Sequence, residues 1–134
     1  MKYTELKEKI SKEVNSFPMA FAFTNKQFEA GMTKLGVIPH QTEKVLSIGG
    51  GGYILKTDSD AFKAMFDRHN KEMAEALTDD DFLVDAIAYE LSNHEYCITG
   101  DPSDALDVLD LSLDDERVKQ SFNKARQEYL AGCE

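Results

Sequence analysis

Apolar side chains recur every three or four positions along most of the chain, and this spacing predicts a mainly helical protein. The first helix is expected over about Thr4–Ser16, because Pro18 ends it. A second helix begins where Thr24 and Gln27 form a capping box, and Gly36 is expected to close it.

The second half of the chain carries the signals for four more helices. Asp58 or Ser59 is expected to cap the third helix, and the aspartates from Asp79 onwards open the fourth. Ser112 with Asp115 is expected to cap the last. The expected inward positions are Phe62, Phe66, His69, Met73 and Leu77 in the third helix, Leu83, Ile87 and Leu91 in the fourth, Leu106 and Leu109 in a short fifth, and Val118, Phe122, Ala125 and Tyr129 in the last.

Three short stretches have the character of strands. Met19–Phe23 predicts a short strand with one well-buried face, since its Phe and Met residues alternate with alanines. Val45–Ile48 and Tyr53–Lys56 predict either a hairpin around the glycines Gly49–Gly52 or a strand with a wide glycine connection. With no internal repeat and no long linker, we expect a single globular domain, residues 1–134, of the α+β class: mainly α, with about five or six helices and a small antiparallel sheet.

Charge is distributed unevenly along the chain. The 134 residues sum to a net charge of −10, but residues 72–116 contain fifteen acidic residues and no Lys or Arg, so that segment carries −15 and the remainder +5. Such a segment repels nucleic acids and anionic membranes. It favours a basic protein partner, although a solvated face that keeps a small protein soluble is the simpler interpretation.

Several aspartates of this segment have helical spacing. Asp81 and Asp85, like the series at positions 104, 107 and 110, would place their carboxylates about 5–6 Å apart along a helix face. A rigid row of this kind can imitate the phosphates of a nucleic-acid strand and occupy a Lys/Arg groove. The expected partner-binding residues are Asp79, Asp80, Asp81, Asp85, Asp101, Asp104, Asp107, Asp110, Asp114 and Asp115.

A second set of residues allows a ligand or metal pocket. Backbone amides around Gly50 and Gly51 can converge on an anion, but no GK[ST] or GxGxxG motif follows, so a turn or close backbone packing is favoured. Glu90 and His94 share a helix face, with Tyr96 nearby. One His and one carboxylate supply only two metal ligands, so no metal or other cofactor is expected and a hydrogen-bond network is the favoured role.

No catalytic constellation is evident, and we expect the protein not to be an enzyme; a small enzyme built on the Glu90, His94 and Tyr96 side chains is the least favoured interpretation. Cys97 is expected to be a small buried hydrophobe and Cys133 a terminal thiol. The N-terminal segment lacks the apolar run of a secretory signal, and no apolar stretch is long enough to cross a bilayer, so a cytoplasmic location is expected.

Five strings of the sequence carry a resemblance to other proteins: MKYTELKEKI, FAFTNKQFEAGM, SIGGGGYI, MFDRH and YELSNHEY. Through these, nearly the whole chain resembles a family of small acidic proteins of unknown function from phages and mobile elements of gut bacteria. The resemblance supplies no catalytic residues. It implies, by analogy with other small acidic phage proteins, an inhibitor of host defence of the anti-CRISPR class.

The expected function is therefore a non-enzymatic inhibitor that binds the basic groove of a host nucleic-acid-handling protein, foremost a CRISPR effector of the Cas9 type, and blocks its binding to DNA. Direct contact with nucleic acid or a membrane is not expected, and the protein would act as a monomer or weak dimer. The alternative is a ligand- or metal-binding accessory module of a mobile element that uses Gly49–Gly52 and the His94 segment.

Overall fold

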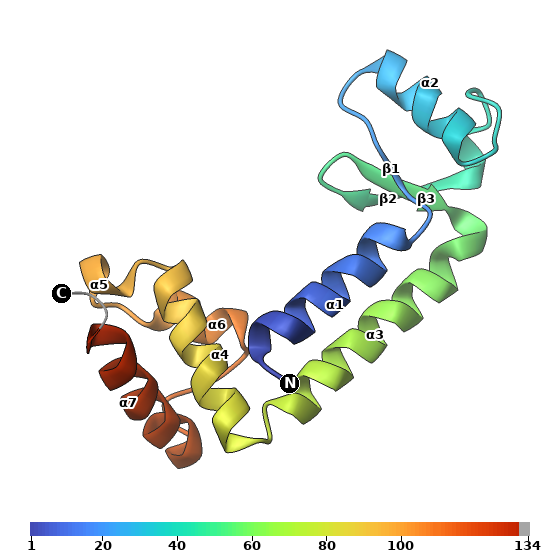
Figure 1. Ribbon diagram of the computed structural model, residues 1–134. Helices are drawn as coiled ribbons and strands as arrows, with labels where there is room; N and C mark the ends of the chain where they lie inside the picture. Colours follow the sequence, from blue (N-terminus) through green and yellow to red (C-terminus); the bar gives the residue numbers. More distant parts are fainter. Residues whose placement is uncertain (132–134) are drawn as a thin grey trace. The chain divides into compact units, whose positions relative to one another are not determined.

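The computed structural model describes residues 1–131 and confirms a mainly α protein with a small antiparallel sheet (Figure 1). The helices are α1 (Tyr3–Ser16), α2 (Asn25–Lys34), α3 (Ser59–Ala76), α4 (Asp80–Asn93), α5 (Tyr96–Thr99), α6 (Ser103–Val108) and α7 (Glu116–Ala131). The strands are β1 (Ala20–Phe21), β2 (Val45–Gly49) and β3 (Gly52–Leu55), and two 3₁₀ turns, η1 (Thr42–Lys44) and η2 (Lys56–Asp58), flank the β2–β3 hairpin. The sequence pattern does not predict the short helix α5.

The chain divides into two compact units. Residues 1–10 with the chain from residue 71 onwards form one unit, and residues 11–70 form the other. The first holds 19 of the 25 acidic residues and eight of the 15 Lys and Arg, a net charge of −11, whereas the second holds six acidic and seven basic residues, a net charge of +1. We call them the acidic unit and the sheet unit.

The sheet unit is an antiparallel sheet with the strand order β1-β3-β2 and with α2 packed on one face. Ala20 pairs with Tyr53, and both are buried against Met32 of α2. The helix comes close because residue 31 is glycine: a Cβ on Gly31 would lie 1.9 Å from the Tyr53 hydroxyl oxygen. That hydroxyl donates a 3.0 Å hydrogen bond to the carbonyl of Phe28 and so fixes the helix to the sheet.

Both predicted ends of α2 are confirmed. Thr24 Oγ1 accepts a hydrogen bond from the N–H of Gln27 at 3.2 Å, and Gln27 Oε1 accepts one from the N–H of Phe23 at 2.8 Å. At the other end, Gly36 has a φ of +79°, and the N–H of Val37 donates back into the last turn, as in a Schellman motif.

The first strand is shorter than Met19–Phe23, since only Ala20 and Phe21 pair with β3. One face is buried as expected, but it is the alanine face: Ala20 is 4% exposed, whereas Phe21 is 57% and Phe23 79% exposed. Within β1, the close approach of α2 at Gly31 leaves room for alanine but not for phenylalanine on the covered face. The two phenylalanines therefore lie at the surface.

The core of the acidic unit is centred on α4, which packs against α6 and α7 (Figure 1). Leu83, Ile87 and Leu91, predicted to point inward, are all 0% exposed. Tyr3 and Leu6 of α1 belong to the same core. Burying a leucine or isoleucine side chain in this core stabilises the fold by about 1.5–3 kcal/mol.

The predicted cap of α7 needs a correction. Asp115 rather than Ser112 caps the helix, because Asp115 Oδ1 accepts a 2.9 Å hydrogen bond from the N–H of Arg117. Ser112 Oγ accepts from the N–H of Asp114 in the preceding turn. The cap thus lies three residues later than the sequence pattern suggests.

The inward face of α3 also differs from the prediction. Phe66 is 38% exposed, while Met65 and His69 are buried. The Phe66 ring lies against Phe62, with 4.8 Å between centroids, so it extends an aromatic cluster at the surface. At 18 residues α3 is the longest helix among residues 1–131, and no helix in this range is long and apolar enough to span a membrane.

Candidate functional site

Five of the ten aspartates expected to bind a partner have a structural role in the acidic unit. Asp79 caps α4, since its Oδ1 accepts a 2.9 Å hydrogen bond from the N–H of Phe82. Asp80 Oδ1 accepts from Arg117 Nε at 2.8 Å, and the same guanidinium donates to the Leu77 carbonyl at 2.8 Å. Through these two contacts, Arg117 connects α7 to the turn between α3 and α4.

Asp85 lies on α4 but caps another helix. Its Oδ2 accepts a 2.9 Å hydrogen bond from the N–H of Tyr3, an amide at the start of α1 that has no partner within its own helix. Asp101 accepts from the hydroxyl and the N–H of Ser103 at 2.6 and 2.9 Å, and these two bonds lower the pKa of Asp101. Asp115 is the cap of α7.

The remaining five aspartates are exposed: Asp81, Asp104, Asp107, Asp110 and Asp114. Within residues 1–131 their carboxylates make no hydrogen bond or ion pair. Asp81 lies on α4, Asp104 and Asp107 lie on α6, and Asp110 and Asp114 lie in the segment that joins α6 to α7. Both α6 and α7 pack against α4. These carboxylates can accept donors from another molecule without breaking an internal contact.

The row predicted for Asp104, Asp107 and Asp110 is present only in part. Asp104 and Asp107 lie three residues apart on α6, but the helix ends before Asp110, which has a left-handed φ of +54°. The N–H of Leu111 bonds back to the Leu106 carbonyl at 2.9 Å, so Asp110 takes the position that glycine fills in other helix ends. Asp110 therefore leaves the helical row.

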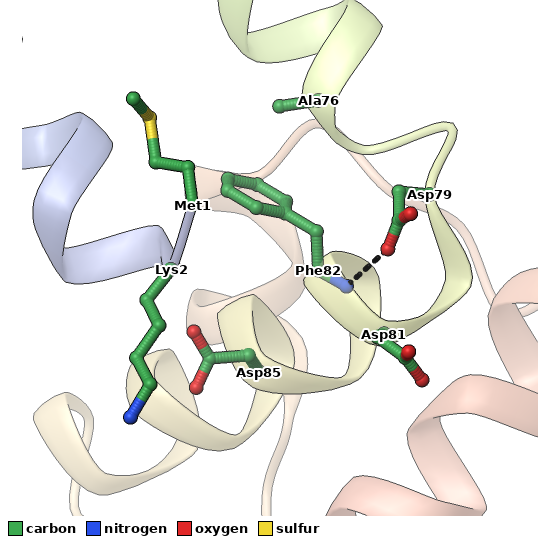
Figure 2. A pocket seen from close by; sticks show the side chains of 7 residues that line it. All are labelled: Met1, Lys2, Ala76, Asp79, Asp81, Phe82 and Asp85. Atoms are coloured by element: carbon green, nitrogen blue, oxygen red, sulfur yellow. Dashed lines mark hydrogen bonds between the residues drawn. The ribbon is translucent and has the colours of Figure 1, made fainter.

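A pocket in the acidic unit has a volume of about 580 Å³. The residues that line it, drawn in Figure 2, are Met1, Lys2, Ala76, Asp79, Asp81, Phe82 and Asp85. Three of these are predicted partner-binding aspartates. The Phe82 ring extends toward Met1 and Ala76, while the carboxylate of Asp81 points away from the ring (Figure 2). Met1, Ala76 and Phe82 make part of the lining apolar, and its three carboxylates outnumber the one ammonium group, that of Lys2. This combination suits the side chain of Lys or Arg, which has an apolar stem and a charged end.

Glu90 is the centre of a buried hydrogen-bond network. It is 0% exposed, and its Oε1 accepts from the Tyr3 hydroxyl at 2.5 Å and from Lys7 Nζ at 3.1 Å, while Asn93 donates to Oε2 at 3.3 Å. Burial by itself raises the pKa of Glu90, but these donors outweigh it and the pKa is lowered. Burial and then the bond to Glu90 raise the pKa of Tyr3. The network holds α1 on α4. A hydrogen-bond network is the role that the sequence favours for Glu90.

The other two residues predicted to share a pocket with Glu90 have different surroundings. His94 Nε2 lies 3.4 Å from Glu90 Oε2 but is buried without a hydrogen-bond partner within residues 1–131. The ring of Tyr96 packs against Phe122 and Tyr129, with centroids 6.2 and 6.0 Å away. In the part of the chain that the structure describes, no group of three or more His, Cys, Asp or Glu is placed to hold a metal ion.

The glycine run is a tight turn in the sheet unit. Gly49, Gly50 and Gly51 have φ values of +90°, +58° and +79°, which glycine adopts without strain. The Gly51 carbonyl accepts a 2.9 Å hydrogen bond from the N–H of Ala22, and a Cβ on Gly51 would lie 2.7 Å from the Phe23 ring. The β2–β3 turn and the packing of Phe23 on it account for these glycines.

The prediction that Cys97 is buried is wrong, because its side chain is exposed. In the short helix α5 the buried residue is Tyr96, and the residues after it face outward: Ile98 is 81% exposed. The N–H of Cys97 donates to the Tyr129 hydroxyl at 3.1 Å. Cys133 lies outside the described residues.

A second groove, not predicted from the sequence, lies in the sheet unit. It has a volume of about 570 Å³ and is lined by Asn15, Phe17, Met19, Ala20, Phe21, Phe23, Gln27, Ala30, Gly31 and Lys34. The alternation of large and small residues in Met19–Phe23 is its only signal in the sequence. That pattern cannot tell which face of the strand a helix covers.

Over residues 2–128 the chain matches a family described as a family of unknown function, DUF7659. Comparison with curated proteins and with solved structures finds no match. The matched range includes both the exposed aspartates and the groove of the sheet unit. Because the match spans nearly the whole chain, the protein belongs to the DUF7659 family.

Proposed function

We propose that this protein is a non-enzymatic inhibitor that binds the basic groove of a nucleic-acid-handling protein through the exposed aspartates of the acidic unit. The observation that carries the proposal is the set of five exposed carboxylates without a hydrogen bond or ion pair within residues 1–131. Unpaired like charges in one unit repel each other and cost stability. A basic partner relieves that repulsion, and a purely structural role does not explain it.

The separation of charge between the units supports this proposal. The acidic unit carries −11 and the sheet unit +1, so the field that attracts a basic protein comes from the acidic unit. Such a field speeds association and is screened over about 8–10 Å at physiological salt. Binding through these aspartates should therefore weaken steeply as salt is added.

The pocket in Figure 2, which the exposed Asp81 lines, offers a specific contact for such a partner. Asp79 and Asp85 already accept one backbone hydrogen bond each, but a carboxylate has further lone pairs for a guanidinium or ammonium group. The stem of an inserted Lys or Arg would lie on Phe82. The pocket thus adds geometric selection to the long-range attraction.

The partner we propose is a protein whose Lys and Arg residues contact nucleic-acid phosphates, because its groove already fits a row of anions. A Cas9-type CRISPR effector, whose arginines read the DNA next to its target, is the specific partner suggested by the resemblance to phage proteins. The inhibitor would then act in the cytoplasm of the bacterial host and would bind neither nucleic acid nor membrane itself.

The experiment is a pull-down from nuclease-treated host lysate with three forms of the protein. The test variant combines Asp81→Asn, Asp104→Asn and Asp107→Asn. The control variant combines Glu29→Gln, Asp60→Asn and Asp67→Asn, which removes the same charge from exposed acidic residues of the sheet unit that make no side-chain hydrogen bond or ion pair within residues 1–131.

The unmodified protein and the control variant should retain the same DNA-binding protein at low salt and release it at high salt. The test variant should retain much less of it. Equal retention by all three forms, or retention that salt does not affect, would argue against the aspartates as the binding surface.

A second candidate function is ligand or metal binding by an accessory module of a mobile element. The buried His94 Nε2, which lacks a hydrogen-bond partner within residues 1–131, favours it. The Glu90 carboxylate already accepts three hydrogen bonds, and Gly51 in the glycine turn is packed against Phe23, so both offer this function less support. Stoichiometric metal in the purified protein that is lost in His94→Ala, but kept in a variant of the exposed His40, would favour this function over the first.

A further inference from the structure

The groove of the sheet unit runs along β1, which is an edge strand in the order β1-β3-β2. The N–H of Ala22 donates to the Gly51 carbonyl at 2.9 Å, so the backbone groups of Ala22 face β3. In an antiparallel pair these directions alternate from residue to residue. The N–H and C=O of Phe21 therefore point away from β3, toward the outside of the sheet.

The outward-facing groups on either side of Phe21 are covered by side chains of α2. Lys34 Nζ donates a 3.2 Å hydrogen bond to the Met19 carbonyl, and Gln27 Oε1 accepts a 2.8 Å hydrogen bond from the N–H of Phe23. Both covering residues line the groove. The edge is thus protected at its two ends and open at Phe21.

The groove is apolar apart from its ends, and the charge on its lining is positive. Phe21 and Phe23 are 57% and 79% exposed, and Lys34 is the single charged residue among the ten that line it. The Lys34 ammonium group has three donors and uses one on Met19. Two donors remain for a carboxylate brought by another molecule.

We propose that this groove binds an extended peptide of a partner protein as a fourth strand beside β1. The peptide would exchange two backbone hydrogen bonds with Phe21, place an apolar side chain against the Phe21 and Phe23 rings, and set an acidic side chain against Lys34. A second copy of this chain fits less well. A two-fold β1–β1 pairing would bring two identical surfaces together, with a lysine on each and no carboxylate among the groove's lining residues.

The probe is a pool of octapeptides that alternate Val, Ile, Leu or Phe with Ser or Thr and end in Glu, compared with the same pool ending in Lys. Binding to ¹⁵N-labelled full-length protein is followed by the NMR signals of the Phe21 and Phe23 amides. The Glu pool should shift these two signals, and the Lys pool should bind about tenfold more weakly, since it lacks the charge-assisted bond to Lys34.

Two variants test the two parts of the groove. Lys34→Glu should reverse the preference between the pools, and Phe21→Thr, which keeps a strand-forming residue, should weaken binding of both. Lys44→Glu and Ile38→Thr alter exposed residues of the same unit outside the groove and should bind as the unmodified protein does. The variant that combines Asp81→Asn, Asp104→Asn and Asp107→Asn should also bind the pools normally, so this result is independent of the proposed inhibitor function.

The proposal is overturned if the Glu pool leaves the Phe21 and Phe23 signals unchanged, or if both pools bind Lys34→Glu as they bind the unmodified protein. A dimer seen by sedimentation that Phe21→Thr abolishes would assign the groove to a second copy and would equally overturn it. Lys34→Glu changes an exposed side chain. It therefore keeps the test decisive if Phe21→Thr does not fold.

Discussion

The hydroxyl of Tyr3 donates a 2.5 Å hydrogen bond to the fully buried carboxylate of Glu90, 87 positions away in the sequence. Lys7, one turn further along α1, donates to the same oxygen at 3.1 Å. A buried carboxylate is tolerated only when donors replace the water it has lost. This requirement specifies how the start of α1 docks on α4, and it explains why Glu90 is not available to a ligand.

Tyr3→Phe keeps the ring in the core but leaves Glu90 with one donor fewer. The free energy of unfolding should fall by about 1.5–3 kcal/mol, the range for a hydrogen bond to a charged group. Urea titration measures it. Tyr89→Phe is the control, because the Tyr89 hydroxyl makes no hydrogen bond within residues 1–131, and it should change stability by less than about 0.5 kcal/mol. An equal loss in both variants would contradict this account of Glu90.

Gly31→Ala tests the close packing of α2 on the sheet. A Cβ there would lie 1.9 Å from the Tyr53 hydroxyl oxygen and 2.9 Å from the Ala20 Cβ. Overpacking should exceed the helix-propensity gain and lower the unfolding free energy by about 1–3 kcal/mol. The loss should be smaller when measured in a Tyr53→Phe background, which removes the clashing oxygen. Stabilisation by Gly31→Ala in both backgrounds would contradict close packing of α2 on the sheet at this position.

Glu13 gives a prediction for pH dependence. Hydrogen bonds from Arg68 at 2.7 Å and with His69 at 3.1 Å lower the pKa of Glu13 from 4.5 to about 2. This pKa is lower in the folded protein than in the unfolded chain, so the ionised carboxylate stabilises the fold above pH 4.5. This contribution to stability is lost as the pH falls from 4.5 toward about 2 and the carboxylate is protonated.

Glu13→Gln should therefore flatten the fall of Tm in that pH window. Thermal unfolding followed by circular dichroism at a series of pH values measures the slope. Glu29→Gln, at an exposed carboxylate without a hydrogen bond or ion pair within residues 1–131, should keep the slope of the unmodified protein. Identical slopes for all three proteins would show that the Glu13 contacts do not stabilise the fold.

The aspartates should separate into two groups by stability. Asp85→Ala removes the acceptor for the Tyr3 amide and should lower the unfolding free energy by about 0.5–2 kcal/mol, as loss of a helix cap does. Asp107→Asn removes a negative charge near the end of α6, where such a charge opposes the helix dipole, and should leave stability unchanged or slightly higher. Comparable losses in urea titrations of both variants would remove the distinction between structural and exposed aspartates.

Local signals explain what the sequence could predict of the fold. The caps at Thr24 and Gly36 and the inward positions Leu83 and Ile87 depend on residues within a few positions of each other, and the structure confirms them. The buried side of β1 depends instead on Gly31, which lets α2 approach the sheet. Gly31 is distant from β1 in the sequence. The alternation of large and small residues in Met19–Phe23 therefore could not predict that Phe21 and Phe23 are exposed.

The candidate site was predictable in its charge but not in its detail. The excess of acidic residues is plain in the sequence, and it falls in one unit of the structure. Which carboxylates are already engaged depends on distant partners, such as Tyr3 for Asp85 and Arg117 for Asp80. The left-handed backbone of Asp110 depends on where α6 ends, which periodicity locates only within a few residues.

The most direct test of the central claim is a competition measurement with a purified Cas9-type effector loaded with guide RNA. Fluorescence anisotropy follows its binding to a labelled target duplex while this protein is added. We expect displacement of the DNA that weakens with salt, is reduced about tenfold or more by the combined Asp81→Asn, Asp104→Asn and Asp107→Asn changes, and is unaffected by the matched changes in the sheet unit. Failure to displace DNA, or equal displacement by the Asn variant, would contradict the proposal that these aspartates occupy the groove of this effector.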